Sequence, residues 1–153
     1  MFSKTKIQLL WLAAALMIAC TTISAQGAGQ TLEGAWLISI SVDGQQGPVA
    51  IDMAVFDAKG SYRIIPSNKG ESEGAGAFQR TGNREFRSTH TQELYDPQGN
   101  FAGIAKVIAI EKVDESGVAL MGTYRVDVLN AAGAVIKQFT GTITGKLVVP
   151  ERL

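Results

Sequence analysis

The sequence predicts an all-β protein, an eight-stranded antiparallel up-and-down barrel. Three observations predict it: a repeated turn motif, alternation of apolar and polar residues between the turns, and links too short for the crossover that parallel strands need. The motif has Asp or Asn first, which hydrogen-bonds within the turn, and Gly fourth, which adopts a left-handed conformation. It occurs at residues 57–60, 96–99, 114–117 and 130–133.

The first element in chain order, residues 1–25, is predicted to be a signal peptide. Lys4 and Lys6 form a short basic region, and residues 7–19 are uncharged and mostly apolar. That run is shorter than the roughly 20 residues of a membrane-spanning helix. Small residues follow it, and cleavage after Ala25 fits the secretory pattern. We therefore expect an exported protein, periplasmic or secreted.

A second processing route uses Cys20, the only cysteine. Residues 17–20, Met-Ile-Ala-Cys, resemble a bacterial lipoprotein box, although Met stands where Leu is usual. Lipidation there would anchor the protein to a membrane, and membrane contact is expected only in that case. By either route the folded part of the chain contains no cysteine. No disulfide can form there, so the fold must depend on its apolar core.

Residues 26–32 are predicted to be a linker, residues 33–148 the β-barrel domain and residues 149–153 a C-terminal tail. Closure into a barrel removes the two open edges of an eight-stranded meander. A two-sheet sandwich is the alternative, but its Greek-key connections need longer links. The expected strands are 35–43, 49–57, 60–66, 75–81, 84–95, 100–113, 118–129 and 134–148.

Alternation with a period of two indicates which side chains face inward. In the first strand Trp36, Ile38, Ile40 and Val42 share one face. The sixth strand is apolar on both faces, with three isoleucines opposite Val107 and Ala109. One of its faces would need cover, which suggests a homodimer.

A short motif at the first strand resembles lipocalins, because Gly34-Ala35-Trp36 matches their Gly-x-Trp. The resemblance implies that Trp36 plugs the closed end of a barrel and that a basic residue near the last strand, here Lys146, packs over the indole. Lipocalins usually have Arg there. More broadly the chain is similar to a group of small bacterial proteins with calycin-like barrels, over about residues 33–148. This likeness implies an apolar interior open at one end, and it rests on residues 78–86, 95–103 and 141–145.

The fifth strand carries His90, the only histidine. If Phe86 and Leu94 face inward, Ser88, His90 and Gln92 do so too. The other register would bury Arg87 and Glu93, which is costly for isolated charges. A polar stripe on an apolar wall is typical of a small-ligand pocket. We therefore predict ligand contacts from Ser88, His90, Gln92 and Tyr124, with Tyr62 as a further hydroxyl; a half-exposed, purely structural His90 is the alternative.

Several function classes are disfavoured by composition. Lys plus Arg and Asp plus Glu number 14 each, without a basic cluster, which argues against a nucleic-acid partner. One histidine and no retained cysteine cannot build the usual zinc set, so no metal or cofactor is expected. The acids Asp52, Glu93, Glu111 and Asp127 are scattered, and solvated strand faces explain them.

The leading hypothesis is a non-catalytic barrel that binds a small apolar or amphipathic molecule. One alternative is a barrel cyclase or isomerase with His90 as its acid–base residue and Ser88, Gln92 or Tyr124 orienting the substrate. Another is an envelope protein whose apolar sixth-strand face binds a second protein.

The processing prediction is tested by expressing the whole chain in a bacterium. We expect the exported protein to begin at Gln26, because the cut after Ala25 leaves small residues at the scissile position. Intact mass spectrometry of the purified protein measures this end directly. A lipid-modified chain beginning at Cys20 would contradict the prediction.

Overall fold

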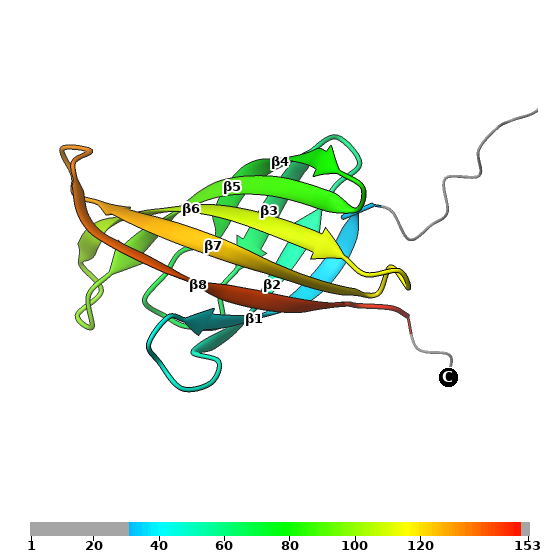
Figure 1. Ribbon diagram of the computed structural model, residues 1–153. Helices are drawn as coiled ribbons and strands as arrows, with labels where there is room; N and C mark the ends of the chain where they lie inside the picture. Colours follow the sequence, from blue (N-terminus) through cyan, green and yellow to red (C-terminus); the bar gives the residue numbers. More distant parts are fainter. Residues whose placement is uncertain (1–30, 151–153) are drawn as a thin grey trace, which may run out of the picture.

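The structure is a computed structural model that describes residues 31–150, and all of its regular elements are strands (Figure 1). Each boundary lies within one residue of the range expected from the sequence. The strands are β1 (Gly34–Val42), β2 (Ala50–Phe56), β3 (Ser61–Ile65), β4 (Gly74–Gly82), β5 (Glu85–Tyr95), β6 (Phe101–Val113), β7 (Ala119–Leu129) and β8 (Val135–Leu147).

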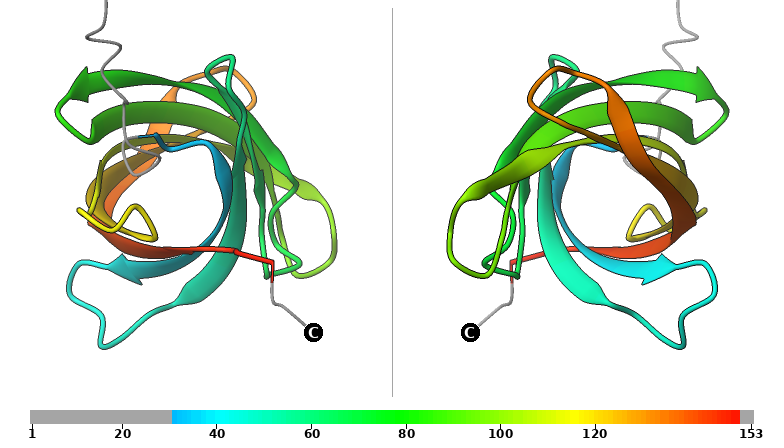
Figure 2. Two further views of the ribbon diagram at one scale, coloured as in Figure 1. Left: turned by 90° about the vertical axis from the view of Figure 1, so that its right-hand side faces the viewer. Right: turned by 90° about the vertical axis from the view of Figure 1, so that its left-hand side faces the viewer.

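The eight strands form one closed antiparallel barrel in sequence order, which confirms the predicted fold class. β1 and β8 close it with a register that runs from Trp36 opposite Leu147 to Val42 opposite Gly141. Viewed along its axis, the molecule is a ring of strands (Figure 2). A closed ring leaves no edge strand, so every strand has two hydrogen-bonded neighbours.

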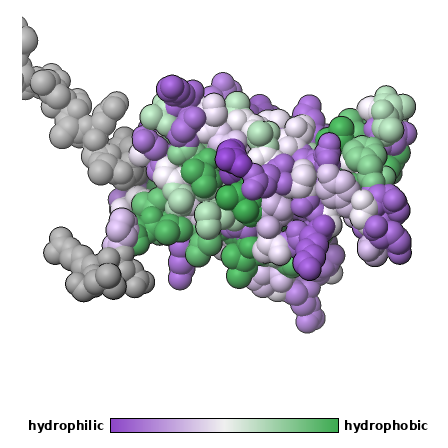
Figure 3. All heavy atoms as spheres, turned by 180° about the vertical axis from the view of Figure 1, so that it is seen from behind, coloured by the Kyte–Doolittle hydropathy of each residue, from purple (hydrophilic) through white to green (hydrophobic). Residues whose placement is uncertain are grey.

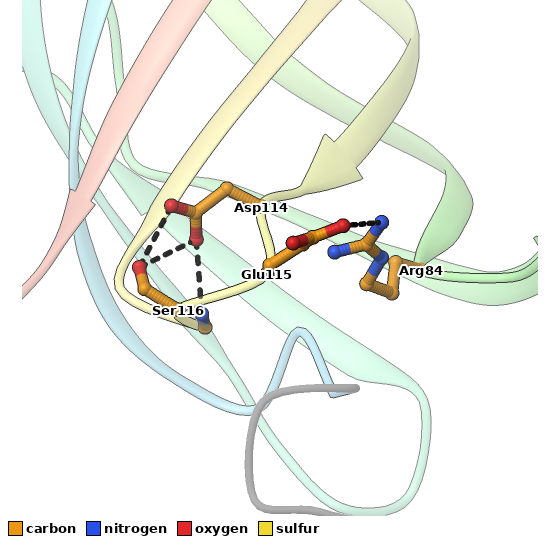
Figure 4. Close-up of polar contacts among 5 residues, drawn as sticks. Arg84, Asp114, Glu115 and Ser116 are labelled. Atoms are coloured by element: carbon orange, nitrogen blue, oxygen red, sulfur yellow. Dashed lines mark hydrogen bonds and ion pairs between the residues drawn. The ribbon is translucent and has the colours of Figure 1, made fainter.

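The turns have the predicted chemistry. The Asp96 carboxylate accepts from the backbone N–H groups of Gln98 and Asn100, and Gly99 has a φ of 84°. In the β6–β7 turn the Asp114 carboxylate likewise accepts from backbone N–H groups, here those of Gly117 (Figure 4) and Ala119. These bonds hold the hairpins in register, because a local carboxylate satisfies the N–H groups that the reversal leaves unpaired.

One end of the barrel is closed by apolar side chains. Trp36 and Leu32 are fully buried there, and the Trp36 indole donates to the Leu32 carbonyl oxygen at 2.9 Å. Phe86 and Val113 are also buried at this end. The indole N–H is therefore satisfied inside the plug, as a buried donor must be. Both ends of the described chain lie on this side of the barrel (Figure 1).

Exposed apolar side chains adjoin one another on the outer face of β1–β3. Leu37, Met53 and Ile65 are neighbours in register and are all exposed, and Ile51 and Val55 flank them on β2. Hydrophobic side chains gather on this face when the molecule is seen from behind (Figure 3). The outer face of β6 is mixed, because Lys106 and Lys112 stand among its isoleucines. A homodimer through β6 stays a prediction.

Residues 1–25, Cys20 and most of the linker lie outside the described residues. Across residues 31–150 the structure has no helix of the length and apolarity required to cross a membrane.

The seam between β1 and β8 yields a stability prediction. A Cβ at Gly141 would lie 2.0 Å from the Ser41 carbonyl oxygen and 2.7 Å from the Tyr124 hydroxyl oxygen. Gly141→Ala should therefore lower the free energy of unfolding by about 1–3 kcal/mol through overpacking. Urea denaturation measures this. Gly70→Ala is the matched control, since its nearest neighbour would be 3.4 Å away; equal losses in both variants would contradict the interpretation.

Candidate functional site

The barrel encloses a cavity of about 380 Å³. Its walls are largely apolar and come from the inner faces of all strands except β4. At the mouth it reaches Val49, Asn68 and Glu71 in the loops opposite the plugged end. An eight-stranded barrel has just enough room for side chains or for one small ligand. Here small inward residues that line the cavity leave that room free, among them Ala54, Ala105 and Ala109.

The polar stripe predicted on β5 faces this cavity. Ser88, His90 and Gln92 are all buried and line it, whereas Arg87 and Glu93 point to solvent. The structure therefore has the inward register that the sequence favoured. Whether these residues contact a ligand stays a prediction.

Ser88 is paired with a buried acid on the neighbouring strand. Its hydroxyl donates to Oε1 of Glu111 at 2.6 Å, while Oε2 of Glu111 has no hydrogen-bond partner among the described residues. Burial raises the pKa of Glu111 from 4.5 to about 7, and the Ser88 hydrogen bond acts in the opposite direction. Near neutral pH this carboxyl therefore exists in both protonation states.

His90 contacts Tyr62 over Gly76, the residue of the intervening strand β4 that is paired with both. The Tyr62 hydroxyl lies 2.6 Å from Nδ1 of His90, and the two rings meet edge to face. Burial lowers the pKa of His90 to about 4, an effect that the nearby Gln92 partly offsets, and burial raises the pKa of Tyr62. At neutral pH His90 is uncharged, so the protonated hydroxyl can donate to Nδ1 and leave the ring proton on Nε2.

Gln92 forms the outer part of the stripe. Its Nε2 donates to the Glu71 carboxylate at 2.5 Å, which fixes the amide orientation because a carboxylate only accepts. Its Oε1 is buried and has no hydrogen-bond partner in the part of the chain that the structure describes. The backbone beside it is glycine: a Cβ at Gly74 would lie 3.0 Å from Cδ2 of His90 and 3.1 Å from this oxygen. Glycine there gives both side chains their space.

Tyr124 also lines the cavity, as predicted, with its hydroxyl donating to the Ser41 carbonyl oxygen at 3.2 Å. Trp36 belongs to the plug. Lys146 is exposed on the outer face of β8, and its neighbour Leu147 is the cross-strand partner of Trp36. The resemblance placed Lys146 over the indole, but strand alternation directs it to solvent. Among the described residues, the cations over rings are Arg80 on Phe86 and Lys137 on Phe139.

The expected solvent exposure of the acidic side chains required the largest correction. Asp52 and Glu111, interpreted from the sequence as solvated, are 3% and 4% exposed and both line the cavity. Asp52 accepts from the backbone N–H of Ser67 at 2.9 Å. Their strand positions carried the signal, because Glu111 shares a period-two face with Ala109 and Val113, and Asp52 with Ala54.

The fold and the site define a closed antiparallel β-barrel with a largely apolar internal cavity and a polar stripe along one wall. Comparison with protein-family models, curated proteins and solved structures gives no match to this chain. Within residues 31–150 no three His, Cys, Asp or Glu side chains group closely enough to hold a metal ion.

The raised pKa of Glu111 predicts a pH-dependent stability. Because the folded state keeps a proton that the unfolded chain releases between pH 4.5 and about 7, this group makes the protein less stable as pH rises through that window. Glu111→Gln removes the effect. The free energy of unfolding of the variant, measured relative to that of wild type, should therefore rise by on the order of 3 kcal/mol between pH 4.5 and pH 8.

Urea denaturation of both proteins at the two pH values measures this difference, and the titration of His90, common to both, cancels. Glu115→Gln is the control, since Glu115 is exposed and pairs only with Arg84 at the β6–β7 turn (Figure 4). A Glu111→Gln difference that does not change with pH would show that the carboxyl is not perturbed.

Proposed function

We propose that this chain is an exported binding barrel, calycin-like in type, which holds a small apolar or amphipathic molecule without transforming it. The observation that carries the proposal is the cavity of about 380 Å³, which lies in the size range of small-molecule sites. Polar groups from β2, β3, β5, β6 and β7 converge on a largely apolar volume, which is how such sites orient a ligand.

The lipocalin resemblance supports this function only through the plan of the barrel. Lipocalin barrels and this barrel both have a tryptophan plug at one end and an apolar interior that opens at the other. Export is part of the proposal, supported by the pattern of residues 1–25, and lipid anchoring at Cys20 is its alternative.

The cyclase or isomerase hypothesis has a specific observation in its favour, although a different one from that expected. Glu111, with a pKa of about 7, is better placed as an acid–base group at neutral pH than His90, whose pKa is about 4. Mass spectrometry and NMR of a ligand recovered after incubation separate the two functions. A carrier returns the molecule unchanged, and an isomerase returns a rearranged product.

The binding proposal is tested with a neutral naphthalene probe whose fluorescence rises in apolar surroundings. Wild type should bind it saturably at one site. Ala109→Trp should reduce the affinity at least tenfold, because Ala109 lines the cavity and the added ring occupies the ligand volume. Ala77→Trp is the control, since Ala77 is exposed on the outer face of β4. Circular dichroism shows whether each variant folds; undiminished binding by folded Ala109→Trp would overturn the proposal.

A further inference from the structure

The cavity is acidic. Three carboxyl side chains line it, from Asp52, Glu71 and Glu111, and none of the described lining residues is a lysine or an arginine. The one basic side chain in the lining, His90, is neutral at physiological pH because burial lowers its pKa to about 4. A ligand that enters this volume therefore meets negative charge without a compensating cation from the wall.

Two buried acceptors in the lining have no hydrogen-bond partner among residues 31–150. They are Oε2 of Glu111 and Oε1 of Gln92, and their residues are 4% and 8% exposed. The bond from Gln92 to Glu71 makes the free atom of the amide its oxygen. Both atoms belong to residues that line the cavity, and with Glu111 ionised both are acceptors, so the groups they lack are hydrogen-bond donors.

We propose that the ligand is a cationic amphiphile, an amine whose ammonium group donates to Glu111 while its apolar body lies against the walls from β1 and β6–β8. An ammonium supplies three donors and the opposite charge, so it pairs with the free Oε2 beside the Ser88 hydroxyl. Gln92 offers a second acceptor nearer the mouth. The inference rests on the proposed binding function and excludes fatty acids, whose carboxylate the three acids would repel.

Binding of an amine should depend on pH through Glu111. Burial holds its pKa near 7 in the empty cavity, and an ammonium pairs with the ionised form. Affinity should therefore fall about tenfold for each pH unit below that pKa and level off above it. An alkylamine, like lysine, keeps its charge over this range. The other titratable groups lining the cavity are Asp52, Tyr62, Glu71, His90 and Tyr124.

The test compares three ligands with the same chain length, octylamine, 1-octanol and octanoate, by isothermal titration calorimetry at pH 6, 7 and 8. For wild type at pH 8 we expect octylamine to bind at least tenfold more tightly than octanol, and octanoate to bind weakest. The octylamine affinity should drop at pH 6, and the octanol affinity should stay constant.

Glu111→Gln should abolish both the preference for the amine and its pH dependence while keeping octanol binding. Glu115→Gln removes an exposed carboxylate and should behave as wild type. The inference would be overturned, with the binding function intact, if octanol or octanoate bound as tightly as octylamine. It would also be overturned if the Glu111→Gln protein kept its preference for the amine. If no ligand binds, the proposed function itself fails. If Glu111→Gln does not fold, the ligand series and pH profile of wild type decide the inference.

Discussion

Closure of the barrel by the β1–β8 ladder is the constraint on which the rest of the structure depends. Once these strands pair, every second residue of each strand faces a volume sealed by the Trp36 plug at one end. Burial in this volume reduces the hydration of the polar groups inside. The pKa shifts of His90 and Glu111 have this common origin, since burial is the largest cause in both.

The unfilled interior follows from where small residues stand. Barrels of eight strands can be filled by their own side chains. Here alanine occupies cavity-lining positions on β2 and β6, while the large aromatic residues Phe56, Phe78 and Phe86 pack together toward the plug. One sequence pattern therefore gives two regions, a dense end that stabilises the fold and a hollow end that is available to a ligand.

Local patterns in the sequence were sufficient for the fold and insufficient for the chemistry. Turn residues and alternation predicted the strands and the inward direction of His90, because both signals act over a few residues. The Ser88–Glu111 and Tyr62–His90 contacts join residues 23 and 28 positions apart, and they depend on register and barrel shear. The acids were misjudged because carboxylates usually lie in solvent, a prior that outweighed the position of Glu111 on an apolar face.

The two buried acceptors without a partner among the described residues lie on the wall of the cavity, and this coincidence has energetic meaning. A buried acceptor without a partner costs about 1–3 kcal/mol, and so does an unfilled core position. A barrel shaped only for stability would replace Glu111 and Ala109 with larger apolar residues and avoid both penalties. In this protein both penalties fall on the inner wall that β5 and β6 form. A bound molecule with a donor group and an apolar body would relieve both at once.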